Sequence, residues 1–268
     1  MHLVDAIILG VVEGLTEFLP ISSTGHLILT AQALGLSGEA VKSFQIVIQA
    51  GAAGAVLLLY WPRVAEMLRG VAGTHDAGRR LLINLAVSTT PAVVAGLLLH
   101  RWIKATLFTT WAVVGALAVG GVAMILVERW RARAIPHPTR TLDSLTVTGA
   151  LAIGLAQCLA LWPGTSRAMV TIVAALLLGC PATTAAEYSF LLAIPTLGAA
   201  TLFEAGWGGA ALIREAGWIP VVAGFVSAAV VAVVAVRGLV RWLTTRGLTF
   251  FGWYRIGLAA VVWWTVGR

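Results

Sequence analysis

The sequence predicts an all-α integral membrane protein with six transmembrane helices and two re-entrant helix–loop–helix pairs, forming one membrane domain over residues 1–268. The first observation behind this fold class is composition, because 59% of the residues are hydrophobic and only 11% are charged. Soluble domains carry roughly 25% charged residues. A soluble protein of this composition would have to bury nearly every helix on all sides. We therefore interpret the chain as a polytopic membrane protein.

The second observation is a set of long apolar segments. Crossing the hydrocarbon core takes about 20 apolar residues at a rise of about 1.5 Å each. Six segments meet this requirement, and each is expected to form one spanning helix: 44–61, 84–100, 110–127, 187–205, 219–236 and 249–267.

The third observation concerns two further apolar stretches, 3–35 and 146–180, each interrupted near its middle. Proline and hydroxyl residues form the interruptions, which read Pro-Ile-Ser-Ser-Thr from Pro20 and Pro-Gly-Thr-Ser from Pro163. Each arm is short for a full crossing, so we expect a re-entrant pair at each place. Non-helical backbone at membrane depth is tolerated only where protein or a wet cavity satisfies its polar groups.

The two halves of the chain resemble each other in order and in a few residues. The first half, 1–127, and the second half, 146–268, each read as a re-entrant pair followed by three spans. Matching positions are Gly10 with Gly154, Glu13 with Gln157, and Ser43-Phe44 with Ser189-Phe190. Three spans per half make the repeats inverted in the membrane. Inverted repeats place their site at the repeat interface near the midplane.

The basic residues predict the orientation. One side of the expected topology receives most of them: Arg63, Arg69, Arg79, Arg80, Arg129, Arg131, Arg133, Arg140, Arg237, Arg241 and Arg246. The other side receives Lys42, Arg101, Lys104, Arg214 and Arg268. The positive-inside rule assigns the richer side to the cytoplasm. Both termini are then outside, and the scattered positions of the basic residues do not form the compact patch that nucleic acid requires.

The first interruption carries paired carboxylates, three hydroxyls and an imidazole. Glu13 and Glu17 are four residues apart and share a helix face, so they can hold a divalent cation or act as base and acid. Ser22 or Ser23 can cap the returning helix, but a cap needs only one hydroxyl, and Thr24 is a third.

His26 extends this first polar cluster. It lies three residues after Ser23 on the same helix face, the minimum arrangement for an activated nucleophile. A single histidine is more often structural, and both interpretations stay open.

The second interruption is organised around Arg167. Its planar guanidinium suits phosphate oxygens better than a lysine would. Thr165 or Ser166 can cap the helix that follows, and a helix N-terminus adds anion affinity. Thr171 is four residues later on the same face. Arg167 can also pair with Glu13 or Glu17, and that role is compatible with binding phosphate.

Four isolated polar residues have simpler expected roles. We expect Glu187 to interact with the N-terminal dipole of a span, and Arg255 to extend its side chain towards the membrane surface. Gln49 and Gln157 are expected to line a cavity or to bridge helices.

These motifs resemble those of the bacterial undecaprenyl-diphosphate phosphatases of the bacitracin-resistance type. The resemblance rests on Glu-Gly-Leu-Thr-Glu-Phe-Leu-Pro-Ile-Ser-Ser-Thr-Gly-His over 13–26 and Trp-Pro-Gly-Thr-Ser-Arg over 162–167, and it extends over essentially the whole chain. It implies six spans with two re-entrant pairs in inverted repeat, usually as a homodimer in the bacterial plasma membrane. It also implies hydrolysis of a C55 isoprenoid diphosphate to the monophosphate, which recycles the lipid carrier for cell-wall synthesis.

The resemblance assigns roles residue by residue. Glu13 and Glu17 match the acidic motif, and Ser22, Ser23 and His26 match the serine–histidine motif. Ser166, Arg167 and Thr171 match Pro-Gly-x-Ser-Arg-Ser-x-x-Thr. Ala168 stands where that motif has its second serine, so we expect that hydroxyl to be dispensable here.

We expect a phosphatase with Glu13, Glu17, Ser23, His26 and Arg167 as its catalytic residues. In this mechanism a divalent cation, Mg²⁺ or Ca²⁺, is held by the two glutamates. The residues expected to bind substrate are Ser22, Thr24, Ser166, Arg167 and Thr171. Ser23 attacks the terminal phosphorus while His26 or a glutamate takes its proton.

Two rival mechanisms make His26 or a metal-activated water the nucleophile. The rival function is a polyprenyl-phosphate transporter or flippase, because broken helices in inverted repeats are also typical of transporters.

Overall fold

A computed structural model describes residues 1–107, 109–134, 138–207 and 209–266, and within these ranges every regular element is a helix. The α-helices are α1 Leu3–Thr16, α2 Ser23–Ala33, α3 Glu39–Leu59, α4 Trp61–Val71, α5 Asp76–Thr106, α6 Thr110–Ala134, α7 Val147–Gln157, α8 Arg167–Leu177, α9 Ala182–Trp207, α10 Gly209–Ala216, α11 Trp218–Thr245 and α12 Thr249–Val266. Two short 3₁₀ helices are η1 Leu142–Ser144 and η2 Cys158–Leu161. The predicted all-α class is confirmed.

Five helices in the described ranges are long and apolar enough to cross a membrane: α3, α5, α6, α9 and α11. They correspond to five of the six predicted spans. The sixth, 249–267, coincides with α12, which has 18 residues and is not among the five. Within its length α12 carries Arg255 and three tryptophans. The described end of α12 is Val266, and residue 267 lies outside the described ranges.

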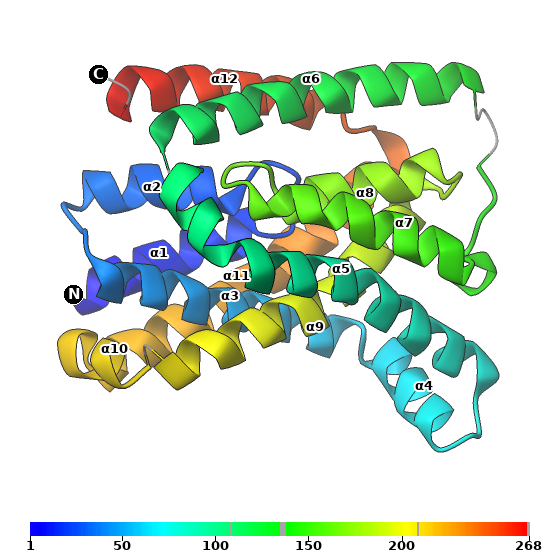
Figure 1. Ribbon diagram of the computed structural model, residues 1–268, viewed down its shortest axis with the longest axis horizontal. Coiled ribbons are helices and arrows are strands. Elements are labelled where there is room, and N and C mark those ends of the chain that lie inside the picture. Colours follow the sequence, from blue (N-terminus) through cyan, green and yellow to red (C-terminus); the bar gives the residue numbers. More distant parts are fainter. Residues whose placement is uncertain (108, 135–137, 208, 267–268) are drawn as a thin grey trace.

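The two interrupted stretches form pairs of short helices. The arms α1, α2, α7 and α8 contain 14, 11, 11 and 11 residues, which corresponds to roughly 16–21 Å of helix. None reaches the roughly 30 Å of a bilayer core. Figure 1 shows the two pairs coming from opposite ends of the bundle, with their connecting loops close together near its middle.

The first arm of each pair packs closely against a long helix. A Cβ atom on Gly10 of α1 would lie 2.3 Å from the carbonyl oxygen of Gly224 in α11. A Cβ atom on Gly154 of α7 would lie 2.6 Å from the carbonyl oxygen of Ser88 in α5. Glycine is therefore required at both positions, which the sequence comparison of the halves had matched.

Helix α12 runs along α6, and the pair forms one edge of the bundle (Figure 1). Glu128 near the end of α6 fixes the start of α12. Its carboxylate accepts hydrogen bonds from the Leu248 amide at 2.9 Å, from the Thr249 hydroxyl at 2.5 Å and from the Thr249 amide. α12 also contacts α2, so this edge reaches the first re-entrant pair.

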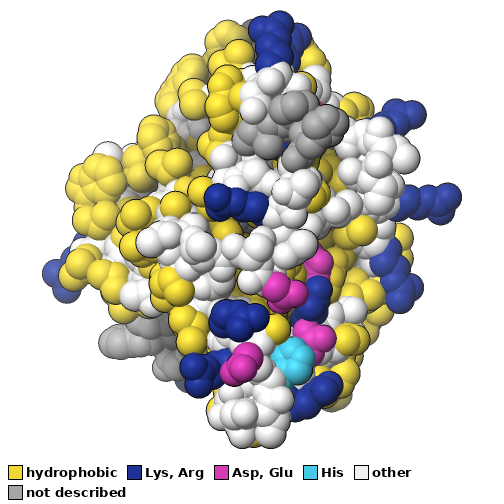
Figure 2. All heavy atoms as spheres, turned by 90° about the vertical axis from the view of Figure 1, so that its right-hand side faces the viewer, with side chains coloured by type: hydrophobic (Ala, Val, Ile, Leu, Met, Phe, Trp, Pro, Cys, Tyr) yellow, Lys and Arg dark blue, Asp and Glu magenta, His cyan; other side chains and the backbone are white. Residues whose placement is uncertain are grey.

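The two ends of the bundle differ. The N-terminus and the described end of α12 lie at one end in Figure 1, and α4 lies at the other. Figure 2 looks onto the α4 end, where basic and acidic side chains are spread among hydrophobic ones. There Arg63 pairs with Glu187 and Glu66, both at 3.1 Å. The predicted dipole role of Glu187 is therefore replaced by an ion pair, because α9 begins five residues earlier, at Ala182.

Candidate active site

Two serines at the tips of the hairpins have unusual backbone conformations. Ser22 has φ 72° and Ser166 has φ 65°, and they are the non-glycine residues with positive φ in the described ranges. Each caps the helix that follows it: Ser22 Oγ accepts from the Gly25 amide at 3.4 Å, and Ser166 Oγ accepts from the Met169 amide at 3.3 Å. Such strain costs about 1–3 kcal/mol and persists where the surroundings enforce it, often at functional sites.

Arg167 and Glu17 join the two hairpins. Arg167 Nη2 donates to Glu17 Oε1 at 3.1 Å, with side-chain exposures of 8% and 7%. Arg167 Nη1 donates to the Ser189 carbonyl oxygen of α9 at 2.9 Å, and its guanidinium lies over the Phe18 ring. The expected pairing of Arg167 with a glutamate is therefore present, and the partner is Glu17.

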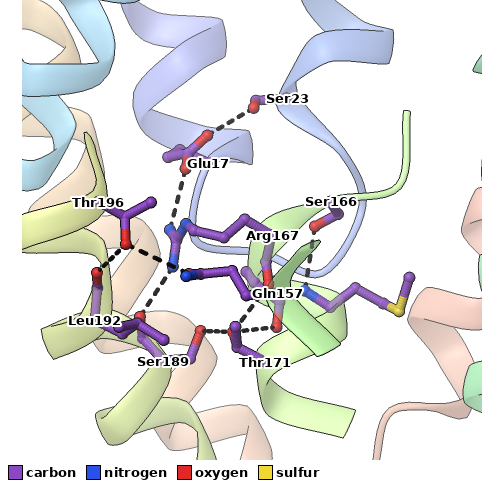
Figure 3. Close-up of polar contacts among 11 residues, drawn as sticks. Glu17, Ser23, Gln157, Ser166, Arg167, Thr171, Ser189, Leu192 and Thr196 are labelled. Atoms are coloured by element: carbon purple, nitrogen blue, oxygen red, sulfur yellow. Dashed lines mark hydrogen bonds and ion pairs between the residues drawn. The ribbon is translucent and has the colours of Figure 1, made fainter. Parts of the chain in front are cut away.

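Ser23 extends this contact into a chain of three side chains. Its hydroxyl donates to Glu17 Oε2 at 2.7 Å, while Arg167 holds the other oxygen of the same carboxylate (Figure 3). The catalytic candidates Ser23, Glu17 and Arg167 thus form one contiguous polar group.

His26 does not pair with Ser23, contrary to the arrangement expected from their spacing. His26 Nδ1 lies 2.8 Å from the Ser22 carbonyl oxygen, and Nε2 lies 2.7 Å from the Tyr254 hydroxyl. Both ring nitrogens are therefore engaged. The physical reason is that the two side chains point to different helices. Ser23, the first residue of α2, points to Glu17 of the preceding segment. His26 points to α12, where its ring stacks on the ring of Tyr254.

Glu13 lies one helical turn before Glu17 and is fully buried. Neither carboxylate oxygen accepts a hydrogen bond from a donor group of the described residues, and the Glu17 carboxyl group lies beside it. Burying an unpaired carboxylate is costly, so this position suits a bound cation. Within the described residues no group of three or more His, Cys, Asp and Glu side chains is placed to hold a metal. Two carboxylates with substrate phosphates are nevertheless a usual Mg²⁺ site.

A cavity of about 260 Å³ opens beside this group. Its polar lining is Glu17, Ser22, Ser23, Thr24, Gln49, Gln157, Ser166, Arg167 and Thr196, and its apolar lining includes Ala92, Leu161, Trp162, Leu197 and Ala200. Gln49 and Gln157 line a cavity, as predicted. Both interruptions contribute to one site with a polar end and an apolar wall.

Thr171 lies behind Arg167 rather than at the cavity. Its hydroxyl lies 2.9 Å from the Arg167 carbonyl oxygen and 2.6 Å from Ser189 Oγ. Because the Ser189 carbonyl accepts from Arg167, Thr171 is placed to hold the segment that orients the guanidinium. Figure 3 shows these groups beside one another.

Sequence reasoning missed several residues around the site. The sequence pattern indicates Ser189 only as a position that matches Ser43, and it gives no signal for Thr196, which donates to Gln157 Oε1 at 3.4 Å. Arg255 was expected to extend towards the membrane surface, which is wrong. It is fully buried, and its Nη2 donates to the carbonyl oxygens of Ala116 and Gly164, because α12 packs against α6.

Fold and site together define a multi-pass membrane protein in which two pairs of short helices meet at a buried Arg167–Glu17 ion pair beside a cavity. The sequence matches the family described as Bacitracin resistance protein BacA over residues 6–261, and the chain belongs to this family.

Several proteins similar to this chain are named undecaprenyl-diphosphatase. It is 48% identical to an undecaprenyl-diphosphatase of Sorangium cellulosum over 97% of this chain and 85% of that protein. It is 44% identical to undecaprenyl-diphosphatase 1 of Burkholderia ambifaria over 96% and 93%. It is 43% identical to an undecaprenyl-diphosphatase of Nitratidesulfovibrio vulgaris over 98% and 97%.

Proposed function

We propose that this protein hydrolyses undecaprenyl diphosphate to undecaprenyl phosphate and inorganic phosphate. The observation that carries the proposal is the Ser23–Glu17–Arg167 chain at the wall of the cavity, which combines a nucleophile, a proton acceptor and a phosphate-binding cation. Family membership and the names of the relatives support the same activity. In the cell this reaction recycles the lipid carrier of wall synthesis and confers bacitracin resistance.

Phosphate binding is assigned to Arg167 and to the two hairpin tips. Arg167 lines the cavity, and its guanidinium group is the cation that would face a bound phosphate. The N-termini of α2 and α8 begin beside the cavity and offer amide groups to an anion. Thr24 and Ser166 add hydroxyls to its lining.

The chemical step follows from the Ser23 contact. Ser23 Oγ attacks the terminal phosphorus, its proton passes to Glu17 Oε2, and the bond from that phosphorus to the bridging oxygen breaks. Undecaprenyl phosphate leaves, and water then hydrolyses the phosphoserine to release phosphate. Arg167 stabilises the charge that develops on the phosphoryl oxygens.

The alternative nucleophiles differ in how well the geometry suits them. His26 has both ring nitrogens engaged by Ser22 and Tyr254, so it is a poor nucleophile in this arrangement. Direct attack by water would use the same cavity, with Ser23 only binding phosphate. Acid quenching during turnover separates the two routes, since a phosphorylated Ser23 peptide supports covalent catalysis and direct incorporation of solvent oxygen without an adduct excludes it.

A divalent cation is included in the proposal because Glu13 and Glu17 fit one. The Glu13 carboxylate supports this assignment because it is buried beside Glu17 and receives no hydrogen bond from a donor group of the described residues, and either Mg²⁺ or Ca²⁺ accepts carboxylate oxygen. When bound, the cation would neutralise part of the diphosphate charge. Glu17 would then have three partners, since it also receives the Ser23 hydrogen bond and pairs with Arg167.

The proposed topology has six crossings, counting α12, and two re-entrant pairs in inverted repeats over 1–127 and 146–268. The paired serine caps and the paired glycine contacts support it. With the arginine-rich end in the cytoplasm, both termini face outward and the first pair enters from outside. The expected homodimer is checked by light scattering of the purified protein.

The direct test is phosphate release from undecaprenyl diphosphate by purified protein in detergent with Mg²⁺. Release is expected from the parent and from Ser37→Ala, whose serine is exposed in the loop after α2. Ser23→Ala is expected to lose at least 100-fold in rate. A parent that binds the lipid but releases no phosphate would favour the transporter, since transport leaves no product in detergent.

A further inference from the structure

Two adjacent residues of α12, Tyr254 and Arg255, contact the two hairpin tips separately. Tyr254 contacts the first tip through His26, and Arg255 contacts the second tip at Gly164. Helix α12 contributes nothing to the lining of the cavity, yet these side chains tie it to both serine turns. In Figure 1, α12 and α6 lie along one side of the two hairpins.

In the first contact, from Tyr254 through His26 to Ser22, the donor and acceptor of each hydrogen bond can be assigned. The Ser22 carbonyl oxygen can only accept, so His26 Nδ1 carries a proton and donates to it at 2.8 Å. A neutral imidazole then has a bare Nε2, which accepts from the Tyr254 hydroxyl at 2.7 Å. The chain Tyr254–His26–Ser22 therefore holds the peptide that precedes Ser23.

The second tie is made by a buried guanidinium. Arg255 is fully buried, and its Nη2 donates to the Gly164 carbonyl oxygen at 3.0 Å and to the Ala116 carbonyl oxygen at 2.9 Å. A Cβ atom at Gly120 of α6 would lie 2.5 Å from the same nitrogen, so glycine there makes room for it. Gly164 has φ 93° and stands two residues before the strained Ser166.

These ties explain how two serines are held in the left-handed region of backbone conformation. Such conformations persist only where the surroundings over-determine them. Ser23 and Arg167 directly follow the two strained serines, so the positions of nucleophile and guanidinium depend on the turns. A misplacement of about 1 Å can cost about 100-fold in rate.

We propose that Tyr254 and Arg255 are positioning residues that set the geometry of the two hairpin tips, Tyr254 through His26 and Arg255 through the Gly164 carbonyl. This inference rests on the proposed phosphatase function. It assigns His26 to the support of Ser22 and Ser23 rather than to attack or proton transfer.

The kinetic test compares Tyr254→Phe and Arg255→Gln with the parent in phosphate release from undecaprenyl diphosphate. Tyr254→Phe loses one hydrogen bond and is expected to lower kcat about 3- to 10-fold, with KM within twofold. Arg255→Gln is expected to lower kcat more, by about 10- to 100-fold. Trp253→Phe, an exposed neighbour on α12, serves as the control and is expected to match the parent.

A double-mutant cycle tests whether Tyr254 acts through His26. In a His26→Ala background, Tyr254→Phe is expected to cause no further loss of kcat. Independent, multiplying losses would overturn this part of the inference. Unchanged kcat in both Tyr254→Phe and Arg255→Gln would overturn the whole of it.

Nitrogen NMR of histidine-labelled protein gives a readout that does not need activity. His26, assigned by its loss in His26→Ala, is expected to show a protonated Nδ1 and a bare Nε2, whose shift moves in Tyr254→Phe. A proton on Nε2 with a bare Nδ1 would contradict the inference. If the parent released no phosphate, the proposed function would fail, whereas this measurement would still test the hydrogen bond between Tyr254 and His26.

Discussion

Replacing Arg167 with lysine tests the site at its centre while keeping the charge. Arg167 uses Nη2 for Glu17 and Nη1 for the Ser189 carbonyl, and its side chain also lines the cavity. A lysine has one side-chain nitrogen and cannot hold both Glu17 and the Ser189 carbonyl while it also binds phosphate. At least one preorganised donor is therefore lost in Arg167→Lys.

The magnitude follows from the burial of the pair. Both side chains are less than 10% exposed, at 8% for Arg167 and 7% for Glu17, so water does not replace the lost contact. Losing one donor that stabilises developing charge costs about 10²–10³ in kcat, or about 2.7–4 kcal/mol. We expect a fall of about 100-fold or more in Arg167→Lys.

The assay is steady-state phosphate release over a range of undecaprenyl diphosphate concentrations, with thermal unfolding in the same detergent. Arg241→Lys is the matched control, because Arg241 is exposed near the end of α11, and it should keep the parent rate. A folded Arg167→Lys variant within threefold of the parent kcat would refute the assignment of this guanidinium to the reacting phosphate.

Three further predictions concern the cation, the support of Arg167 and the packing. Glu13→Gln should raise the Mg²⁺ concentration for half-maximal activity at least tenfold. Chelation of Mg²⁺ from the parent should abolish phosphate release until Mg²⁺ is restored. An unchanged Mg²⁺ requirement in Glu13→Gln would show that Glu13 is not part of the cation site. Thr171→Val loses the hydroxyl contacts behind Arg167 and should lower kcat for phosphate release about 3- to 10-fold. A variant with the parent kcat would show that the hydroxyl does not position Arg167. Gly154→Val should lower the free energy of unfolding in denaturant by about 1–3 kcal/mol, because its Cβ would lie 2.6 Å from the Ser88 carbonyl oxygen. Gly54→Val is the control and should lower the free energy of unfolding less, because a Cβ at Gly54 has open space around it. Equal losses would contradict the close packing of α7 on α5.

Much of this architecture could be predicted from local sequence. Long apolar segments identify α3, α5, α6, α9 and α11, because the bilayer sets a length that composition alone reveals. Proline and hydroxyl residues at 20–24 and 163–166 identify the helix breaks, and the cost of charge in an apolar segment points to Glu17 and Arg167.

Contacts between distant helices could not be predicted in the same way. His26 is 228 residues from Tyr254 in sequence, and only the packing of α12 on α2 brings them together. The three-residue separation of Ser23 and His26 predicts that they share a helix face, but it does not predict which neighbour each side chain contacts. Arg255 was misjudged for the same reason, since its burial depends on α6 and the second hairpin tip.

The most direct test of the account is a double-mutant cycle across the two hairpins. Phosphate release from undecaprenyl diphosphate is measured for the parent, Glu17→Gln, Arg167→Gln and the double variant. If both residues form one catalytic site, each single variant loses at least 100-fold, and the double variant loses no more than the worse single one. Losses that multiply, or a single variant that keeps the parent rate, would contradict a shared active site formed by the two broken helices.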